Sequence, residues 1–350
     1  MTDYLITGGA GFIGINLAAH ALTQGRRVTL LDNFSRRGAE EHVRWLRAEF
    51  GDKNLTVLRA DIRTDHQVLA EAVEKAGVVF HLAAQVAVTT SVQNPRQDFD
   101  INALGTFNVL EAVRGSRARP IVIYSSTNKV YGKLANLVVA ERGNRYEYRD
   151  LAGVPEDQPL DFYSPYGCSK GTGDQYVIDY SRIYDLKTVV FRQSCIYGPH
   201  QFGVEDQGWL AWFAIRALNQ QPVTIYGDGK QVRDVLFVDD LIAAYEAAVA
   251  RIDVASGQAY NVGGGPTYTL SLLELLELLH QRLGRKMESR FDDWRPGDQK
   301  VYISDLSKIS RDLGWMPRVD PTAGVGRLVD WLKENLPSSE PAKRSEPARI

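Results

Sequence analysis

Residues Tyr4-Leu5-Ile6-Thr7-Gly8-Gly9-Ala10-Gly11-Phe12-Ile13-Gly14 begin as an apolar run and pass directly into a glycine-rich segment. The apolar run is typical of a buried strand, and a helical pattern of apolar residues follows over 16–24. Between a strand and a helix, glycines let the backbone approach a pyrophosphate, whose charge is met by amide groups at the helix N-terminus. The stretch therefore predicts a dinucleotide-binding turn in which the cofactor contacts are Gly8, Gly11, Phe12, Ile13 and Gly14.

An acidic residue ends the next predicted strand. Val28-Thr29-Leu30-Leu31-Asp32 places a carboxylate at a strand end, about 20 residues beyond the glycines. We expect Asp32 to accept hydrogen bonds from the adenosine ribose hydroxyls and to repel a 2′-phosphate, which favours NAD over NADP. Two cations, Arg36 and Arg37, follow closely and keep NADP open as an alternative.

Helical patterns and strands continue to alternate up to residue 124. Helical patterns over 39–50, 67–75 and 95–114 alternate with apolar strands over 55–58, 78–81 and 120–124. This alternation predicts an α/β fold with a Rossmann-type, doubly wound parallel sheet, in which ligands lie beyond the carboxyl ends of the strands. The residues that follow these strand ends are predicted cofactor contacts: Asn33, Asp61, Ile62, Leu82, Ala83, Ala84, Gln85 and Ser125.

A phenol and an ammonium group stand four residues apart in Ser164-Pro165-Tyr166-Gly167-Cys168-Ser169-Lys170, at the start of a helical pattern that runs to Tyr184. On a helix, side chains four residues apart share one face. A fixed cation near a phenol stabilises the phenolate and lowers its pKa, so Tyr166 is a candidate for proton exchange with a substrate hydroxyl. Tyr226 and Lys230 repeat the spacing, but glycines at 227 and 229 predict a turn there.

The second half of the chain predicts a smaller α/β lobe, because helices and strands no longer alternate regularly between residues 207 and 283. We expect an NAD-binding Rossmann domain over 1–192, with a polar insertion or lid over 133–160. We expect a mainly substrate-binding lobe over 193–336, some segments of which return to the main sheet. Residues 337–350 are short of apolar residues and predict a disordered tail.

Composition excludes several classes of protein. A chain of 350 residues that is 44% hydrophobic can bury a large core, and its net charge of −2 gives no basic surface for nucleic acid or an anionic membrane. Its apolar runs are too short to span a bilayer, and no secretory signal opens the chain, so we expect a cytoplasmic protein. Two cysteines and six scattered histidines predict neither a disulfide framework nor a metal site. Cys168 is expected to pack beside Tyr166.

The order of these motifs resembles that of the extended short-chain dehydrogenase/reductase superfamily over about residues 3–335. The resemblance rests on Gly8, Gly11, Gly14, Asp32, Thr127, Tyr166 and Lys170. Four stretches resemble nucleotide-sugar 2-epimerases that act on CDP-tyvelose and CDP-paratose: Ser126-Thr127-Asn128-Lys129-Val130-Tyr131-Gly132, the stretch from Ser164 to Lys170, Asp206-Gln207-Gly208-Trp209, and Gln231-Val232-Arg233-Asp234-Val235-Leu236. The resemblance implies NAD as cofactor, a CDP-linked sugar as substrate, and a homo-oligomer, either dimer or tetramer.

The resemblance also implies roles for individual residues. Thr127 would hold a substrate hydroxyl, Tyr166 would exchange its proton, and Lys170 would lower the pKa of the tyrosine while binding the nicotinamide ribose. Arg233 and Arg295 fall where relatives bind the diphosphate of a sugar nucleotide, and a surface ion pair is the alternative for each. Asn102 falls behind the active-site helix, where its side chain would bridge backbone groups near the cofactor or simply pack. The other implied substrate contacts are Asn128, Lys129, Gln193 and Gln207.

Two positions separate branches of the superfamily. Sugar-nucleotide 4,6-dehydratases that resemble this chain carry an Asp-Glu pair directly after the threonine, whereas this chain has Asn128 and Lys129. Because dehydration lacks its carboxylates, we expect an NAD-dependent epimerase that acts through a transient keto sugar. The resemblance alone implies that it inverts carbon 2 of a CDP-hexose or deoxyhexose. A UDP- or GDP-sugar 4-epimerase stays open, since it needs the same threonine, tyrosine, lysine and NAD. A non-catalytic NAD-binding sensor is the alternative from a different class.

Overall fold

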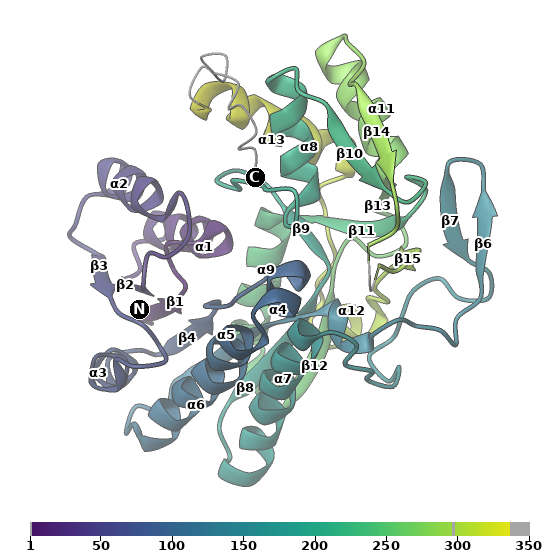
Figure 1. The fold of residues 1–350 in the computed structure, drawn as a ribbon. Helices are drawn as coiled ribbons and strands as arrows, with labels where there is room; N and C mark the ends of the chain where they lie inside the picture. Colours follow the sequence, from purple (N-terminus) through teal and green to yellow (C-terminus); the bar gives the residue numbers. More distant parts are fainter. Residues whose placement is uncertain (1, 296–297, 337–350) are drawn as a thin grey trace, which may run out of the picture.

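The computed structural model describes residues 2–295 and 298–336. A parallel sheet with helices on both faces forms one part of the molecule, and a smaller lobe of strands and helices adjoins it (Figure 1). The predicted α/β class and doubly wound sheet are thereby confirmed. None of the described helices is both long and apolar enough to cross a lipid bilayer. The tail predicted over 337–350 lies outside the described residues.

The main sheet has seven parallel strands in the order β3-β2-β1-β4-β5-β8-β12. Successive residues of β1 point to opposite faces, so Tyr4 and Ile6 join the core on one face and Leu5 joins the core on the other. The strand order reverses between β1 and β4, and ligands bind beyond the carboxyl ends of the strands at such a point. The strands are β1 (Tyr4–Thr7), β2 (Val28–Asp32), β3 (Leu55–Arg59), β4 (Val78–His81), β5 (Ile121–Thr127), β8 (Thr188–Gln193) and β12 (Gln258–Val262).

Helices cover both faces of this sheet. The core on the face of Tyr4 includes residues from α1 (Phe12–Thr23), α2 (Ala39–Phe50) and α9 (Val238–Ala250). The core on the face of Leu5 includes residues from α3 (His66–Glu74), α6 (Gly105–Gly115) and α7 (Pro165–Tyr184). Because both faces are buried, the inner strands β1 and β4 are mainly apolar and do not alternate with polar residues.

The segment predicted as one helix over 95–114 consists of three pieces. They are α5 (Pro95–Phe99), a π-helical turn η1 (Asp100–Leu104) and α6, and the short α4 (Val88–Gln93) precedes them. Asn94 caps α5, because its Oδ1 accepts a hydrogen bond from the Gln97 amide at 3.2 Å. A π turn adds one residue to a helical turn and often occurs at functional sites. Here the turn carries Asn102, whose side chain reaches Ser169 on α7.

The smaller lobe is built around β11 (Val232–Phe237). β9 (Cys195–Tyr197) and β15 (Val301–Tyr302) pair with β11 in parallel, and β13 (Thr269–Ser271) pairs with it antiparallel. A separate parallel pair joins β10 (Val223–Tyr226) to β14 (Ser289–Asp292). The other helices in this half of the chain are α8 (Trp209–Leu218), α10 (Ile252–Ala255), α11 (Leu272–Leu283), α12 (Ser307–Leu313) and α13 (Pro321–Asn335).

The chain crosses between the two parts more than once. It leaves the main sheet after β8, builds β9, β10 and β11 in the smaller lobe, and returns through α9 to β12. β12 pairs with β8 from Gln258 opposite Val189 to Val262 opposite Gln193, which makes β12 an edge strand of the main sheet. Sequence patterns do not predict β12, because Gln258-Ala259-Tyr260-Asn261-Val262 has neither a regular alternation nor a long apolar run.

The polar stretch over 133–160 contains an antiparallel hairpin, β6 (Val139–Arg142) and β7 (Arg145–Tyr148), which stands out from the body at the right of Figure 1. The hairpin is tied to the smaller lobe by the Tyr146 hydroxyl, which donates to Asp228 Oδ2 at 2.6 Å. Further along, Val154 forms a parallel bridge with Ser304. The stretch therefore lies against the smaller lobe.

Candidate functional site

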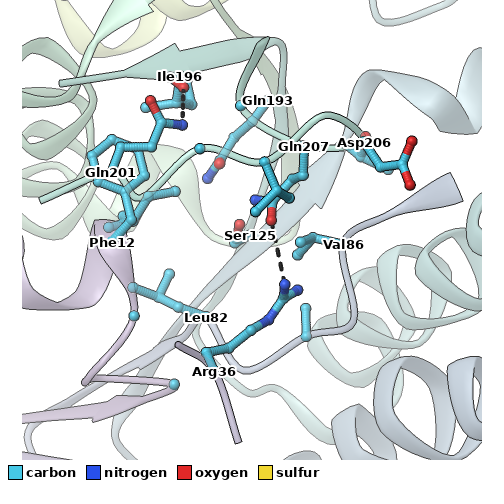
Figure 2. A pocket seen from close by; sticks show the side chains of 18 of the residues that line it. Phe12, Arg36, Leu82, Val86, Ser125, Gln193, Ile196, Gln201, Asp206 and Gln207 are labelled. Carbon is cyan, nitrogen blue, oxygen red and sulfur yellow. Dashed lines mark hydrogen bonds between the residues drawn. The ribbon is translucent and has the colours of Figure 1, made fainter. Parts of the chain in front are cut away.

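A cavity of about 610 Å³ opens beyond the carboxyl ends of the main-sheet strands, and side chains of both parts of the molecule line it (Figure 2). Its volume lies within the range of roughly 300–1,000 Å³ that is typical of ligand sites. The following sequence-predicted residues line it: Gly8, Gly11, Phe12, Ile13, Gly14, Asp32, Asn33, Asp61, Ile62, Leu82, Ala83, Ala84, Ser125, Thr127, Asn128, Lys129, Tyr166, Lys170, Gln193, Gln207, Arg233 and Arg295. Gln85 and Asn102 do not line it.

The glycine-rich turn lies against the loop that follows β4. Gly8 has a φ of +68°, and a Cβ atom added to it would lie 2.6 Å from the backbone nitrogen of Ala83. A Cβ atom on Gly14 would lie 2.7 Å from the Gly8 oxygen, at the point where α1 starts beneath the turn. Side chains at either position would push the turn and the helix apart. Glycine is therefore required for the close approach of the backbones on this side of the cavity.

Asp32 stands at the end of β2 with both carboxylate oxygens bound to backbone amides. Oδ2 accepts from Ala10 at 3.0 Å and Oδ1 accepts from Phe34 at 2.8 Å. Burial raises the pKa of Asp32 above its ordinary value, and the two amides act in the opposite direction. Each carboxylate oxygen has two lone pairs, so Asp32 can still accept hydrogen bonds from a ligand.

Asp61 and Asn33 form a second polar group on the same side. The Asn33 side chain donates to Asp61 Oδ2 at 2.9 Å, and the Arg63 guanidinium donates to the same carboxylate at 2.9 and 2.7 Å. The hydrogen bonds from Arg63 hold the pKa of Asp61 well below its usual range, although burial acts against them. Asp61 is therefore a fixed anion at the end of the cavity near Asp32.

Tyr166 lies in the first turn of α7, next to Thr127 at the end of β5. Ser164 caps this helix by accepting from the Gly167 amide at 3.0 Å, and Pro165 takes the first helical position. The Tyr166 side chain is 8% exposed, and burial raises its pKa to about 12 while a hydrogen bond with Thr127 lowers it. Thr127 Oγ1 also accepts from the Lys129 amide at 3.2 Å, in the 3-10 turn η2 (Asn128–Tyr131). The two candidate catalytic hydroxyls thus lie beside each other.

Lys170 follows Tyr166 by one helical turn. Its ammonium group donates to the backbone oxygen of Ser125 at 2.5 Å and lies 4.2 Å from the ring centre of Tyr124. Burial lowers the pKa of Lys170 to about 7. The structure brings Lys170 to the same cavity as Tyr166, but the hydrogen bond of its ammonium group goes to β5 and not to the phenol.

Gln85 and Asn102 lie behind the cavity wall. Asn102 is 1% exposed, its Oδ1 accepts from the Gln85 amide at 2.9 Å, and its Nδ2 donates to the Gln85 oxygen at 3.0 Å. Asn102 thus bridges the two backbone groups of Gln85, as the family resemblance implies. The two residues hold the loop that presents Leu82, Ala83 and Ala84 to the cavity, and they do not form part of the wall themselves.

Three cations line the half of the cavity that faces the smaller lobe. Lys129 donates to Gln299 Oε1 at 3.4 Å, and burial lowers the pKa of Lys129 to about 8. The Arg233 guanidinium donates to the Val232 oxygen at 2.8 Å and lies 3.7 Å from Asp298. Arg295 lies 3.2 Å from Asp206 and 3.8 Å from the ring centre of Tyr226. Each arginine therefore combines a place in the cavity wall with an ion pair.

The three uncharged substrate candidates lie nearby and differ in how their side chains are bound. Asn128 Oδ1 accepts from the Thr127 hydroxyl at 3.4 Å, and the Gln193 amide donates to the Tyr245 hydroxyl at 2.5 Å. Gln207 accepts at 3.3 Å from Arg36, which extends across the cavity from the loop after β2 (Figure 2). Arg36 thus joins the cofactor side of the cavity to the side formed by the smaller lobe.

Some residues of the cavity wall have no signal in the sequence. Arg36 is notable there only as a cation close to Asp32, and its contact with Gln207 depends on how the lobe sits on the sheet. Tyr226 lines the cavity as well, although its spacing from Lys230 is part of a turn, in which Gly227 and Gly229 have positive φ. Its hydroxyl donates to Glu205 Oε1 at 3.0 Å. Contacts between distant segments of this kind leave no local pattern.

The two cysteines differ in their surroundings. Cys168 is exposed, so the expectation that it packs beside Tyr166 is wrong; its position on α7 turns it outward, where its thiol donates to the Phe162 oxygen at 3.4 Å. Cys195 lines the cavity and accepts from the Trp209 indole at 3.4 Å. Within 2–295 and 298–336, no three His, Cys, Asp or Glu side chains are grouped so that they could hold a metal ion.

Comparisons with known proteins agree with this fold and cavity. The family described as GDP-mannose 4,6 dehydratase matches residues 5–328. CDP-paratose 2-epimerase of Salmonella typhi is 45% identical over 334 residues, which cover 93% of this chain and 98% of that protein. Sequence similarity thus extends over almost the whole chain.

Solved structures show the same architecture. UDP-glucose 4-epimerase of Thermotoga maritima, solved with UDP-glucose, superposes with a TM-score of 0.82 at 29% identity and covers 96% of this chain and 100% of that chain. DesIV, a dTDP-glucose 4,6-dehydratase of Streptomyces venezuelae solved with NAD bound, has a TM-score of 0.81 at 29% identity. The match covers 95% of this chain and 97% of the DesIV chain. Epimerases and dehydratases are thus similar to this chain over nearly all of its length. The chain belongs to the GDP-mannose 4,6-dehydratase family, which has the extended short-chain dehydrogenase/reductase fold.

Proposed function

We propose that the protein is an NAD-dependent epimerase that inverts carbon 2 of a CDP-linked hexose or deoxyhexose. The observation that carries the proposal is the grouping of Thr127, Tyr166 and Lys170 around one cavity, with Asn128 and Lys129 directly after the threonine. This grouping provides for reversible oxidation of a hydroxyl and lacks the carboxylate pair that dehydration requires. The 45% identical CDP-paratose 2-epimerase supports both the carbon and the nucleotide.

The cofactor half of the cavity fits a dinucleotide. Close packing at Gly8 and Gly14 leaves the backbone of the turn free to contact a pyrophosphate, and the N-terminus of α1 adds favourable dipoles. Asp32 retains free lone pairs for ribose hydroxyls and presents a negative charge that disfavours a 2′-phosphate. Gly8, Gly11, Phe12, Ile13, Gly14 and Asp32 would hold the cofactor here.

The chain's own groups would carry out the proton transfers. Bound NAD would supply reversible hydride transfer at the sugar carbon without net consumption of the cofactor. Thr127 orients the reacting hydroxyl, and Tyr166 takes its proton and later gives it back. Because burial favours the neutral phenol, Tyr166 needs positive charge nearby when it acts as a base. The charge of Arg36 lowers the pKa of the phenol, and Lys170, one helical turn further along α7, would add a second positive charge.

The lobe side of the cavity would bind the nucleotide diphosphate. Arg233 and Arg295 have planar guanidinium groups suited to phosphate oxygens, and Lys129 adds a third cation between Thr127 and Arg233. Their ion pairs with Asp298 and Asp206 are partly exposed and can rearrange when a stronger anion binds. Asn128, Gln193 and Gln207 are left to bind sugar hydroxyls.

A UDP-sugar 4-epimerase is the second candidate, because UDP-glucose 4-epimerase of Thermotoga maritima has nearly the same fold. Product analysis with CDP-, UDP- and GDP-hexoses separates the two. We expect turnover of CDP-sugars with inversion at carbon 2. Turnover of UDP-glucose to its 4-epimer, with CDP-sugars left unchanged, would replace the first candidate by the second, and NAD binding without turnover of any sugar would favour the sensor.

We also propose that the protein forms a homo-oligomer, a dimer or a tetramer. Phe107 of α6 and Tyr176 of α7 are 37% and 45% exposed, with ring centres 5.8 Å apart, and Phe99 of α5 is 52% exposed. Neighbouring exposed aromatic rings are typical of an interaction surface. Sedimentation of the wild type should give a mass that is a multiple of the 39.1 kDa of one chain. Tyr176→Glu should lower the measured mass. A monomeric wild type would contradict this proposal. A cytoplasmic location stays a prediction.

A further inference from the structure

A buried carboxylate that the proposed mechanism does not use lies behind Tyr166 and Lys170. Asp98 of α5 is 1% exposed. Its Oδ2 accepts from the Ser169 hydroxyl at 2.5 Å, and its Oδ1 accepts from Asn102 Nδ2 at 3.1 Å. Ser169 Oγ in turn accepts from Asn102 Nδ2 at 3.1 Å, which closes a triangle of three buried side chains. Because donors reach both oxygens, the triangle suits the ionised form of Asp98.

The triangle joins the parts of the chain that form the proposed active site. Ser169 stands directly before Lys170 on α7, and its hydroxyl also lies 3.2 Å from the backbone carbonyl oxygen of Tyr166. Asn102 Nδ2 also donates to the Gln85 backbone oxygen, and its Oδ1 accepts from the Gln85 amide, so Asn102 holds the loop after β4. Asp98 therefore connects the turn between Tyr166 and Lys170 with the loop that carries Ala83.

Asp98 differs from the other buried carboxylate near Lys170. Asp174 accepts two hydrogen bonds from Arg192, each at 3.0 Å, so its charge is matched. In the described part of the chain, no Lys, Arg or His comes within ion-pair distance of Asp98. Burial raises the pKa of Asp98, and the hydrogen bond from Ser169 and the charge of Lys170 act in the opposite direction. A buried charge is costly unless another charge balances it, and Lys170 is the cation whose field reaches Asp98.

The protonated form of Lys170 needs a negative charge nearby. Burial lowers its pKa to about 7, and Asp174 and Asp98 act in the opposite direction. The other titratable groups that face it are neutral: burial lowers the pKa of His81 on β4 to about 3 and raises those of Tyr124 on β5 and Tyr166 on α7. Asp174 contributes more than Asp98, but Asp174 is also paired with Arg192. Among the described residues, Asp98 is therefore the carboxylate near Lys170 that has no ion-pair partner of its own.

We infer that Asp98 is a positioning residue of the active site, which fixes the turn between Tyr166 and Lys170 through Ser169 and Asn102 and keeps the Lys170 ammonium protonated. The inference rests on the proposed roles of Tyr166 and Lys170. A neutral amine at position 170 would not stabilise the phenolate of Tyr166, and it would have one N–H donor fewer for a ribose. Asp98 thus acts on the reaction without touching substrate or cofactor.

The test compares NAD binding by the full chain, measured by calorimetry between about pH 5 and 9, in the wild type and in Asp98→Asn. Wild-type affinity should fall as the pH rises through about 7, where Lys170 loses its proton. In Asp98→Asn the midpoint should move to lower pH by about one unit, since an opposite charge has been removed. Asp98→Glu keeps the charge and should restore the wild-type midpoint, which loss of packing alone would not do.

Two matched variants separate charge from structure. Ser169→Ala removes a hydrogen bond to Asp98 and keeps the charge, so its midpoint should stay near that of the wild type. Asp100→Asn removes a neighbouring carboxylate that pairs with exposed Arg96 at 2.8 Å, and it should leave the pH midpoint of NAD binding unchanged. If Asp98→Asn does not fold, Asp98→Ser, which is smaller and still accepts from Ser169, takes its place.

The outcomes are distinguishable. An unchanged midpoint in a folded Asp98→Asn or Asp98→Ser protein, with normal NAD binding by the wild type, would overturn the inference alone. A pH dependence that persists in Lys170→Met would assign the titration to another group and would also overturn it. Failure of the wild type to bind NAD would overturn the proposed function, and the inference with it.

Discussion

Arg192 donates two hydrogen bonds to the carboxylate of Asp174, each at 3.0 Å, and the two side chains are 5% and 0% exposed. Ser126 donates to the same carboxylate at 2.7 Å. The pair thereby connects three elements at the positions next to the proposed catalytic groups: β5 beside Thr127, α7 one turn beyond Lys170, and β8 beside Gln193. The pair lies behind the cavity wall, to which Ser126 and Gln193 belong.

Breaking this pair should destabilise the protein strongly. Arg192→Met leaves Asp174 as an unpaired buried charge, and we expect it to lower the free energy of unfolding by roughly 3–5 kcal/mol in chemical denaturation. The double variant Arg192→Met/Asp174→Leu should recover a large part of that loss, because no charge is left behind. Arg282→Met removes one partner of an exposed pair, 46% and 49% exposed, and should cost about 1 kcal/mol or less. Equal losses in the buried and exposed single variants would show that Asp174 is solvated.

Cofactor preference should depend on Asp32. The wild type should bind NAD more tightly than NADP, and Asp32→Ala should narrow the difference, because the carboxylate no longer binds the ribose or repels a 2′-phosphate. Asp52→Ala changes a carboxylate whose side chain is 72% exposed, and it should leave both affinities unaltered. Calorimetric titration with each cofactor measures the ratio. Equal wild-type affinities would contradict the role of Asp32.

The two tyrosines that precede a lysine by four residues should behave differently. Tyr166→Phe should lower turnover by roughly 100-fold or more, the scale of a lost acid-base group, while NAD binding stays nearly intact. Tyr226→Phe should change turnover little, because it loses a hydrogen bond to Glu205 and keeps the ring under Arg295. Steady-state kinetics with the sugar nucleotide compares them. Similar losses in both variants would mean that the wrong tyrosine has been assigned.

Arg233 should act as a phosphate ligand more than as a structural ion pair. A charge-assisted hydrogen bond contributes roughly 1.5–3 kcal/mol, so Arg233→Ala should weaken CDP binding about tenfold or more. Its ion pair with Asp298 is long, at 3.7 Å, so the melting temperature should change little. Arg290→Ala, at a 73% exposed arginine, is the control and should leave CDP binding unchanged. A large loss of stability with unaltered CDP affinity would support the ion-pair role.

The route of inversion leaves an isotopic record. If the carbon-bound hydrogen leaves and returns as a hydride inside the cavity, it never exchanges with water. Epimerisation in heavy water should therefore give product without deuterium at the inverted carbon, as measured by NMR or mass spectrometry. Exchange at the neighbouring carbon, which a keto sugar acidifies, is compatible with this route. Stoichiometric deuterium at the inverted carbon would instead indicate deprotonation of carbon, with a different role for Tyr166.

Sequence patterns predict the elements whose signals are local. The turn from Tyr4 to Gly14, the strand that ends at Asp32 and the helix that starts at Ser164 each combine a strong periodicity with a turn or cap, and the structure has them where expected. The π turn between α5 and α6 is missed, because a shift of the apolar pattern by a single residue within a helix resembles the ordinary irregularity of such patterns. The hairpin over 139–148 is also missed, because its two strands are short and rich in charged residues.

The candidate site likewise contains residues that the sequence predicts and residues that it does not. Residues that follow strand ends, such as Asp61, Ala83 and Ser125, line the cavity because the fold itself brings strand ends together. Asp98 gives no comparable signal, because a buried carboxylate on a short helix looks like a solvent-facing one in the sequence. Its role depends on Ser169, which is 71 residues away along the chain. Contacts of this range follow from packing, which single-sequence patterns do not encode.

The position of β12 has a consequence for synthesis of the chain. Once β8 has emerged from the ribosome, its outer edge stays unpaired until residues 258–262 arrive, and at roughly 5–20 residues per second this takes on the order of several seconds. During that time the open edge can pair with other nascent chains, as exposed strand edges tend to do. We therefore expect fragments that stop shortly after residue 193 to aggregate, whereas chains that extend through β12 can close the sheet and stay in solution.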